Sequence, residues 1–441
     1  MVPSLSSSLR VREMWIRIVE QCFRRELGDS ISLPDDTVDL IEAGILDSMS
    51  WVSFLRGVEI ASGVSDLGSA LNEQPATFAS VFAALQQVDS KPLEQDDPPP
   101  EFVRPGRGNL ALITGSSLAL ASRVVPSEEI DRAFGMPIGK LRHRAGIESL
   151  AYAAEGENEL TLGAKAAEET LRGTSCGAHE LDWIIATSET HHNYPLLAAQ
   201  LHSRLLVREN CGALDVGGAC LGLLNALAVA RSLIGSGAAQ NILVVTADVH
   251  SRTLTPGRVK GEFGGLFGDG ATAFLLRGGN GTESDGGYRV GEFLFGCAGQ
   301  YAAAIQVSDD LEGGLAVRFD GDALSRAAIT RLEKTISAVE SRSGIPRAAV
   351  GYFATHQPNP RLLTLLAKQC GVSPQAFPPI CRTSGNLGSS MCAAALHTAL
   401  QSASQLPVAE RKPIFLASLG PGLLFGGTWL SIGDQRTEAG D

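Results

Sequence analysis

Apolar side chains recur at helical spacing near the start of the chain. Over residues 8–26 they are Val11, Met14, Trp15, Ile18, Val19 and Cys22, so that one stripe can face a core. A second helix is predicted to open at residues 45–48, with Trp51, Val52, Leu55 and Val58 on its apolar side. A short third helix is predicted through residues 78–85. The pattern therefore predicts an all-α helix bundle at the N-terminus.

Beyond residue 108 the pattern changes to short apolar runs that alternate with longer amphipathic segments, which is typical of an α/β fold. Strands are predicted at residues 109–115, 182–187, 212–217, 241–248 and 271–276, and again at 288–295, 351–355, 377–384, 412–420 and 427–433. Helices are predicted at residues 195–206 and 221–234, and again at 323–342, 360–370 and 389–403.

The two halves of this region also share local sequence. ATSETHHNYPLLAAQL is echoed by ATHQPNPRLLTLLAKQ, and DVGGACLGLLNALAVA is echoed by TSGNLGSSMCAAALHTAL. We interpret this as an internal duplication in which Cys220 and Asn386 occupy equivalent strand-to-helix junctions. His356 follows a strand end that matches the His191 region. Packing of the halves about a pseudo-twofold axis would bring these junctions together, where α/β folds bind their ligands.

A proline-rich segment separates the helical region from the α/β region. Residues 91–108, KPLEQDDPPPEFVRPGRG, are dense in charge and show no hydrophobic period, which favours an extended linker. The alternative is a surface loop inside one domain, but structureless loops of this length are uncommon in compact domains. We therefore predict a small domain at 8–90 and a large domain at 109–441, with halves at roughly 109–280 and 285–435.

Composition narrows the classes of function. The chain of 441 residues carries a formal net charge of −12, which argues against nucleic acid as a partner. Its eight cysteines are too sparse for a disulfide scaffold, and no CxxC pair indicates a structural metal site. The N-terminus has no apolar signal-peptide core, and no stretch is typical of a membrane span. The expectation is a cytoplasmic protein without metal or membrane partner.

Cys220 is the first candidate for chemistry. It lies in DVGGACLG, between an apolar strand and a helix rich in alanine and leucine. A thiol at a helix N-terminus is close to the positive end of the helix dipole, which favours the thiolate and lowers the pKa. The alternative interpretation is a buried structural cysteine.

Three further segments in the second half could complete a site. His356 stands where a strand ends and a helix opened by Pro360 begins, and Asn386 lies in SGNLGSS at another junction. Judged alone, they are a capping histidine and a turn asparagine. Leu419 to Gly427 form a glycine-rich turn between the last two strands. It is either a tight turn or the source of a backbone N–H that stabilises an oxyanion.

Together these segments resemble the thiolase-fold condensing enzymes, and most closely the β-ketoacyl-[acyl carrier protein] synthase III family. The resemblance covers residues 109–435. It rests on the cysteine in DVGGACLG, the histidine in THQPNPR, the asparagine in SGNLGSS, FGDGATAFLL at 267–276, the GPG turn and RAGI at 144–147. The resemblance implies a duplicated five-layer αβαβα domain.

The resemblance also implies roles for individual residues. Cys220 would accept the acyl group, His356 and Asn386 would support decarboxylation and the carbanion, and the amides of Cys220 and Gly422 would form the oxyanion hole. Arg144 would bind substrate, and Tyr194, in a stretch with Thr190, His191 and His192, would shape the acyl pocket. Members primed by coenzyme A often carry a tryptophan four residues before the arginine. Lys140 stands there instead, which favours a carrier-bound acyl donor over coenzyme A.

The N-terminal region resembles the acyl and peptidyl carrier proteins over roughly residues 10–88. Gly44-Ile45-Leu46-Asp47-Ser48-Met49 is similar to their attachment motif, which implies that Ser48 carries covalent 4′-phosphopantetheine added by a phosphopantetheinyl transferase. Asp35, Asp36, Asp39 and Glu42 would give the acidic surface typical of carriers. The alternative interpretation of Asp-Ser before a helix is a simple capping signal.

The leading hypothesis is a carrier–ketosynthase fusion that condenses acyl and malonyl thioesters with loss of CO2, in fatty-acid-like or polyketide metabolism. The alternatives are an acyltransferase that forms an ester or amide without decarboxylation, and an inactive interaction module. The interpretation as an inactive interaction module is weakened by the presence of Cys220, His356 and Asn386 together. The relatives pair as dimers, and the strand at 241–248 would otherwise expose a hydrogen-bonding edge, so we expect a homodimer.

Overall fold

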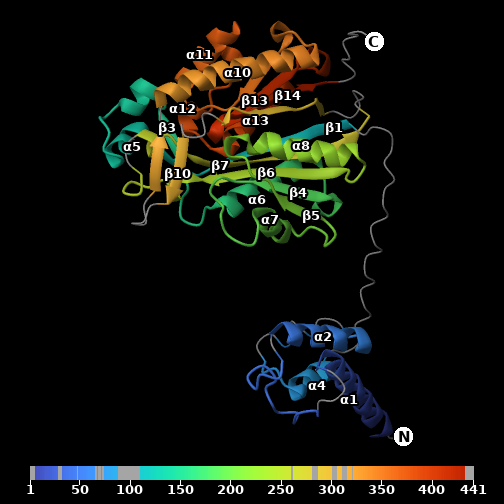
Figure 1. Ribbon diagram of the computed structural model, residues 1–441. Helices are drawn as coiled ribbons and strands as arrows, with labels where there is room; N and C mark the ends of the chain where they lie inside the picture. Colours follow the sequence, from blue (N-terminus) through green and yellow to red (C-terminus); the bar gives the residue numbers. More distant parts are fainter. Residues whose placement is uncertain are drawn as a thin grey trace. The chain divides into compact units, whose positions relative to one another are not determined.

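The computed structural model divides the chain into two compact units, Met1–Glu101 and Phe102–Asp441 (Figure 1). It describes residues 5–27, 32–46, 48–64, 67, 71, 74–87, 110–259, 262–280, 287–299, 305–309, 315–319 and 321–432. The boundary between the units falls inside the segment 91–108, which was predicted to be a linker and lies outside the described residues. Each unit is considered by itself below.

The N-terminal unit contains the three helices that the apolar pattern predicts. They are α1 (Leu5–Leu27), α2 (Ser48–Ser62) and α4 (Phe78–Gln87). Phe23, Phe54 and Phe78 form the centre of their shared core, and the rings of Phe23 and Phe78 meet edge to face at 5.0 Å. Between α1 and α2, the Asp39 carboxylate accepts the backbone N–H groups of Ile41, Glu42 and Ala76, which fixes this loop to the segment before α4.

The large unit is built on one mixed sheet of ten strands. Its order is β12-β13-β14-β8-β1-β7-β6-β4-β5, with β9 paired beside β14. The first half contributes β1 (Leu110–Leu120), β4 (Trp183–Thr187), β5 (Gly212–Asp215), β6 (Asn241–Val249) and β7 (Asp269–Gly279). The second half contributes β8 (Tyr288–Val290), β9 (Leu294–Cys297), β12 (Tyr352–Thr355), β13 (Ile414–Gly420) and β14 (Leu424–Ser431).

Two antiparallel sheets of two strands each lie outside this sheet in the described part of the chain. They are β2 (Arg123–Pro126) with β3 (Ser149–Tyr152), and β10 (Ile305–Asp309) with β11 (Leu315–Phe319). Within the large sheet, β8 pairs with both β1 and β14 and thereby joins the two halves. The strands β4, β5 and β6 are parallel to one another, as are β12 and β13. Their carboxyl ends therefore meet at shared edges of the sheet.

Helices cover the sheet in layers, as Figure 1 shows. On the outside of the first half lie α6 (Glu159–Thr174) and α7 (Leu197–Leu205), and on the outside of the second half lie α10 (Gly321–Ser343) and α11 (Pro360–Cys370). Between the halves lie α8 (Gly222–Gly235) and α13 (Ser389–Ser404). Short helices complete the unit: α5 (Ser127–Ala133), α9 (Glu262–Gly265) and α12 (Cys381–Ser384). The strands thus lie between the outer helices and the central α8 and α13, as the resemblance to the thiolase-fold enzymes implies.

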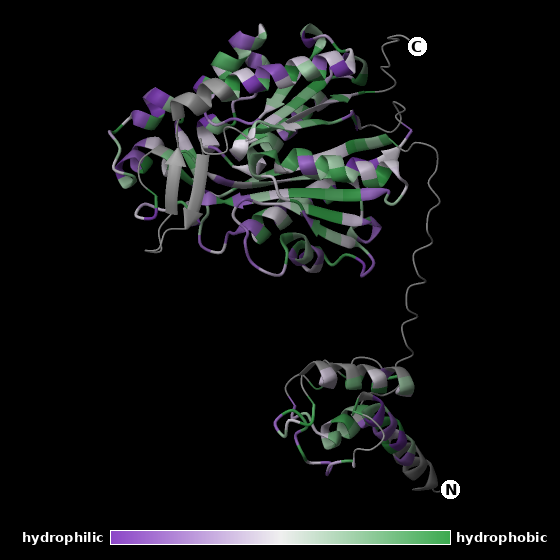
Figure 2. Cartoon of the chain, viewed as in Figure 1, coloured by the Kyte–Doolittle hydropathy of each residue, from purple (hydrophilic) through white to green (hydrophobic). Residues whose placement is uncertain are grey.

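The burial of each layer follows its hydropathy. In Figure 2 the inner strands are largely hydrophobic, whereas the outer helices show hydrophilic residues on one side. Every residue from Ile242 to Val249 of β6 is buried, and α13 is buried continuously from Ser389 to Leu396. Helix α13 contributes mostly small residues there, so the strands of both halves of the large unit approach it closely. None of the helices that the structure describes is long and apolar enough to cross a membrane.

Two expectations from the sequence are wrong. Residues 377–384 form a turn and α12 rather than a strand. The physical reason is Pro378-Pro379, since two consecutive residues without an N–H cannot continue a ladder. The strand at 241–248 does not expose an edge, because β6 pairs with β4 on one side and with β7 on the other. In the described sheet the edge strand of the first half is β5.

Enlarging a small residue of α13 tests the central layer. Ala395 is fully buried between the halves, so Ala395→Leu should lower the free energy of unfolding of the large unit by about 1–3 kcal/mol through overpacking. Chemical denaturation measures the change. Gln401→Leu, at an exposed position of the same helix, should stay within about 0.5 kcal/mol of wild type. Equal effects of the two substitutions would contradict the central placement of α13.

Candidate active site

Cys220 lies on a sharp turn between β5 and α8. The turn η3 (Ala219–Leu221) follows Gly218 at φ 142°, and Ala219 is left-handed at φ 49°. A left-handed residue other than glycine costs about 1–2 kcal/mol, so the surrounding structure must hold this turn. Part of that restraint is visible: the Ser418 hydroxyl donates to the Cys220 carbonyl at 2.7 Å. The thiol residue itself is 9% exposed.

The glycine-rich turn after β13 lies directly against Cys220. A Cβ built on Gly420 would be 3.7 Å from the Cys220 amide nitrogen and 3.4 Å from the Gly218 carbonyl oxygen. Gly422, at φ 77°, lies in the following turn η10 (Pro421–Leu423), where the left-handed backbone favours glycine. The structure therefore brings the two segments expected to form an oxyanion hole side by side.

His356 directly follows β12 and is held against the middle of β13. Its backbone N–H donates to the Ala417 carbonyl at 3.3 Å. The next side chain, Gln357, is buried and donates to the Pro378 carbonyl at 2.6 Å, which fixes the loop. The His356 ring is 5% exposed, and its Nδ1 has no hydrogen-bond partner among the described residues. Burial lowers the pKa of His356 to about 4, against a smaller opposing effect of the Glu189 charge, so the ring is neutral near pH 7.

Asn386 lies between α12 and α13 and is attached to the first half of the chain. Its N–H donates to the Leu266 carbonyl at 2.8 Å, and its carbonyl accepts the Gly268 N–H at 2.9 Å. The side-chain Oδ1 accepts the Gly388 N–H at 3.1 Å. The part of this buried amide that can donate to a ligand is therefore its NH2 group.

Three acidic or basic side chains that the sequence analysis did not select join these segments. Glu189 is two residues beyond β4, His250 directly follows β6, and Asp248 lies at the end of β6. His250 Nε2 is 3.5 Å from Glu189 Oε2, and the Glu189 N–H donates to Asp248 Oδ1 at 2.6 Å. Asp248 Oδ2 also accepts the hydroxyl of Ser389 at 2.6 Å and the N–H of Ser390 at 3.1 Å. The network thus reaches the start of α13 in the second half.

Glu189 is the residue whose interactions reach both Cys220 and His356. Its carboxylate lies beside the Cys220 thiol, and its charge acts on both Cys220 and His356. Burial opposes its ionisation, but the hydrogen bond and charge of His250, with the Cys220 contact, hold the pKa of Glu189 below its usual range. Burial would likewise lower the pKa of His250, but Glu189, Asp248 and Asp269 raise it to about 9. The two side chains therefore form a buried ion pair.

The expected lowering of the Cys220 pKa is wrong. Burial, and then the charge and hydrogen bond of Glu189, raise the pKa of Cys220 well above its ordinary value. A helix terminus contributes only about 0.3–1 kcal/mol, less than the 1.4 kcal/mol or so that corresponds to one pKa unit. Full burial shifts a pKa by up to about 3–5 units. Burial therefore changes the pKa of Cys220 more than the helix terminus does, and the Cys220 side chain is a protonated thiol at rest.

The two residues expected to bind substrate lie on exposed segments. Arg144 is in η1 (Leu141–Ala145), and the adjoining Gly146 lies against Pro360, where a built Cβ would be 3.3 Å from the proline Cβ. Tyr194 is 89% exposed. It lines a hollow of about 230 Å³ together with Ser188, His191, His192, Asn193, Leu196, Asp215, Val216 and Gly217. This hollow lies beside the carboxyl ends of β4 and β5, where the chain continues to Glu189 and Cys220.

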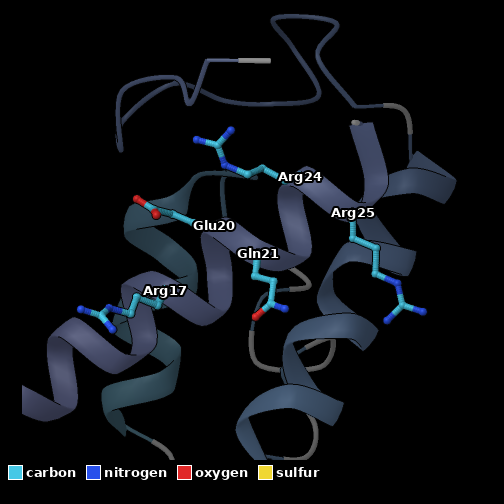
Figure 3. Close-up of a pocket in the computed structure, with 5 residues that line it drawn as sticks. All are labelled: Arg17, Glu20, Gln21, Arg24 and Arg25. Atoms are coloured by element: carbon cyan, nitrogen blue, oxygen red, sulfur yellow. The ribbon is translucent and has the colours of Figure 1, made fainter. Parts of the chain in front are cut away.

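A second hollow, of about 470 Å³, lies on α1 in the N-terminal unit. Figure 3 shows its lining side chains Arg17, Glu20, Gln21, Arg24 and Arg25, which spread apart along the helix. No nucleophile lines it. Elsewhere in the N-terminal unit, Ser48 is the first residue of α2, and Asp47 lies outside the described residues. Among the described side chains, no group of three His, Cys, Asp or Glu residues could hold a metal ion.

Comparison with known proteins decides the family. The model of 3-oxoacyl-[acyl-carrier-protein (ACP)] synthase III matches residues 214–299, and the model of its C-terminal part matches residues 341–432. The beta-ketoacyl-[acyl-carrier-protein] synthase III of Rhodobacter capsulatus is 30% identical over 326 residues, which cover 72% of this chain and 97% of that protein. The enzyme of the same name from Roseobacter denitrificans is 30% identical over 266 residues, or 60% and 81% of the two chains. The chain belongs to the synthase III family.

A solved synthase III has the same fold. The 3-oxoacyl-[acyl-carrier-protein] synthase III of Aquifex aeolicus superposes with a TM-score of 0.65 at 24% identity, covering 73% of this chain and 99% of that one. The predicted thiolase-like α/β fold and the prediction of an acyl-transferring condensing enzyme are confirmed. Both matched ranges of the family model lie in the large unit. The carrier interpretation of the N-terminal unit therefore depends on its sequence and helices.

Gly388 tests how closely the synthase III site is packed. A Cβ at Gly388 would lie 2.3 Å from His250 Cε1, whereas one at Gly371 would meet nothing within 4 Å, and both glycines have positive φ. Gly371→Ala should lower stability by about 1–2 kcal/mol. Gly388→Ala should lower it by more, because its ψ of −126° lies outside the left-handed helical region and its Cβ would meet His250. Only Gly388→Ala should also displace His250 and reduce acyl transfer, measured by single-turnover mass spectrometry. Full activity of a folded Gly388→Ala protein would contradict this packing.

The His250 ion pair predicts a dependence of stability on pH. The folded-state pKa of about 9 exceeds the ordinary 6.5, so the stabilisation is complete below pH 6.5 and is lost as the pH rises toward 9. The melting temperature of the large unit should therefore fall across this window. His250→Gln should be less stable at pH 6.5 and should flatten the decline. Parallel profiles for the two proteins would show that His250 is not a buried cation.

Proposed function

We propose that the large unit catalyses decarboxylative Claisen condensation through an acyl-Cys220 intermediate. The observation that carries the proposal is the convergence of Cys220 with the Gly420–Gly422 turn and with two neutral donors, His356 after β12 and Asn386 between α12 and α13. Acyl and malonyl thioesters, held on a carrier or on coenzyme A, are the proposed substrates, in keeping with the names of the relatives.

In the first half-reaction, Cys220 sulfur attacks the carbonyl carbon of an acyl thioester. Negative charge develops on the carbonyl oxygen, where the backbone N–H groups of Cys220 and Gly422 would donate to it. The bond to the donor sulfur then breaks, which leaves the acyl group on Cys220. The left-handed turn at Ala219 presents the sulfur at the start of α8, beside the turn that contains Gly422.

In the second half-reaction, a malonyl thioester loses CO2 and leaves an enolate whose oxygen needs hydrogen-bond donors. The His356 ring is neutral above about pH 5, because its pKa is about 4, and the Asn386 side chain carries no charge. Neutral donors stabilise the enolate without attracting the malonyl carboxylate into a salt bridge that would stabilise the starting material instead. The enolate carbon then attacks the acyl-Cys220 carbonyl and releases the β-keto product.

We further propose that the N-terminal unit is an acyl carrier. Ser48 is the first residue of α2, and the positive end of a helix dipole stabilises a phosphoester at such a position. Ser48 would hold 4′-phosphopantetheine, added by a phosphopantetheinyl transferase, and the group would supply a thiol for acyl chains. The carboxylates of Asp35 and Asp39 accept backbone N–H groups, which lower the pKa of each and keep the surface beside α2 acidic.

A homodimer of the large unit is the proposed assembly. In the described sheet, β5 pairs only with β4 and leaves its other edge free. Tyr194 and Leu206, at either end of α7 beside this edge, are 89% and 86% exposed. An exposed edge with large apolar side chains is suited to pairing with a second copy.

Asn386→Asp separates condensation from simple acyl transfer. A carboxylate repels the enolate that the amide stabilises, so CO2 release from a malonyl thioester should fall by about 100-fold or more, while acylation of Cys220 persists. Cys220→Ala should abolish acyl loading of the large unit and leave Ser48 open to pantetheinylation. Intact-protein mass spectrometry measures the loading. If wild type releases no CO2 from any malonyl-type thioester but acylates an alcohol or amine, the function is acyl transfer without decarboxylation.

A further inference from the structure

Glu189 has no part in the condensation described above, yet it lies in contact with the nucleophile. Its side chain is 18% exposed, and Oε1 is buried without a well-aligned donor among the described residues. An ionised carboxylate in such a place loses hydration that few hydrogen bonds replace, which costs several kcal/mol. The structure retains it because His250 lies 3.5 Å from its other oxygen, Oε2.

The position of the carboxylate is fixed on several sides. The Glu189 backbone N–H is bound to Asp248, and His250 stacks on Phe267 with ring centroids 4.7 Å apart. Phe267 in turn pairs with the backbone of Asn386. On the remaining side, a Cβ at Gly388 would lie 3.2 Å from Glu189 Cδ and 2.9 Å from His250 Nε2. Only a residue without a side chain leaves room for both groups.

The Cys220 thiol needs a base, since it is protonated at rest, and the structure offers two. His356 is neutral and could accept a proton, but burial makes its ring reluctant to become a cation. Glu189 lies beside the thiol with a buried oxygen, Oε1, that has no hydrogen-bond partner among the described residues, and a proton transferred to it would neutralise a charge rather than create one. The second transfer creates no new cation in the buried site. The positive charge of His250 remains in place throughout.

We propose that Glu189 is a catalytic residue that accepts the Cys220 thiol proton during acylation and delivers it to the departing thiol, with His250 as its positioning residue. The inference rests on the proposed acyl-Cys220 intermediate. As the bond from Cys220 sulfur to the carbonyl carbon forms, the S–H bond breaks and its proton moves to the Glu189 carboxylate. When the carbonyl carbon separates from the donor sulfur, that sulfur takes the proton from Glu189. The products are the Cys220 thioester and a free thiol, and Glu189 is ionised again.

The basicity of the leaving group gives a direct test. Glu189→Gln keeps the shape of the side chain but removes the base, and acylation by an alkyl thioester such as octanoyl-N-acetylcysteamine should slow by about 100-fold or more. An aryl thioester releases a thiolate that needs no proton to depart, so its rate should fall less. The ratio of the two rates within one protein does not depend on the folded fraction. An unchanged ratio in Glu189→Gln would overturn the proposal.

Alkylation provides a second readout with the opposite sign. Iodoacetamide requires a thiolate but transfers no proton to a leaving thiol. Glu189→Gln removes the negative charge that raises the pKa of Cys220, so Cys220 should be alkylated at lower pH than in wild type. Loss of packing would move alkylation and acylation together, whereas loss of the base makes acylation slower and alkylation easier. Glu180→Gln is the matched control: it lies before β4, at the opposite end from Glu189, and should change neither rate.

His250→Gln tests the positioning role through the pH profile of acylation. In His250→Gln the cation is absent, so the pKa of Glu189 should rise and the fall of the acylation rate at acid pH, the acid limb of the profile, should move to higher pH. In Glu189→Gln this acid limb should be absent. Glu189 is also faced by Asp248, His356 and Cys220, and His250 by Asp248 and Asp269, none of which changes in these variants. An acid limb that stays in place in both variants would overturn the proposal. If wild-type Cys220 accepts no acyl group from any thioester, the proposed function itself is wrong.

Discussion

The active site depends on the burial of one cation, His250, between carboxylates that the chain brings from separate strands. Glu189 follows β4, Asp248 ends β6 and Asp269 begins β7, and all three raise the pKa of the imidazole between them. Each carboxylate is held in turn: Asp248 by Ser389 and Ser390, and Asp269 by the N–H of Ser251 and of Ala153. Removing one member would leave a buried charge unpaired, which is far more costly than the loss of an exposed ion pair.

This network also divides the chemistry between the duplicated halves. The parallel strands β4, β5 and β6 carry Glu189, Cys220 and His250 at their carboxyl ends, so in the proposed mechanism the first half supplies the nucleophile and the charged groups. The parallel strands β12 and β13 carry His356 and the glycine turn at theirs, so the second half supplies neutral donors. Helix α13, buried between the halves, connects the two sets because its first residues bind Asp248. Duplication therefore produced one asymmetric site from two similar frameworks.

The sequence predicted where the helices and strands of this framework lie better than it predicted which strands pair with one another. Hydrophobic periods located most strands of the large sheet and most of the long helices, because a period reflects which faces of a segment are buried. They missed α6 and the strands β2, β3, β10 and β11. They did not show which strand lies at an edge, so β6 was misplaced, and the run at 377–384 was read as a strand despite Pro378 and Pro379. The candidate residues Cys220, His356 and Asn386 were identifiable because their junction motifs together resemble those of the synthase III family. The short motifs around these residues are what allowed the sequence to identify them.

Glu189 was missed for a different reason. A glutamate after a strand is usually a solvated surface residue, and its burial here depends on Asp248 and His250, about sixty residues further along the chain. The signal that could have found it is the pair of charged residues, Asp248 and His250, at the end of an apolar strand that should contain none. The pKa of Cys220 was misjudged for the same reason, since it follows from burial and from this distant carboxylate and not from the nearby helix terminus.

The raised pKa of Cys220 has a consequence for selectivity. A thiolate held permanently at a helix terminus reacts with any electrophile that reaches it. A thiol that loses its proton only as a new bond forms reacts well only when the carbonyl oxygen lies where the Cys220 and Gly422 amides can stabilise its charge. On this view the reactivity of the nucleophile is supplied by the bound thioester together with Glu189, and the resting enzyme is protected by the same burial that makes a base necessary.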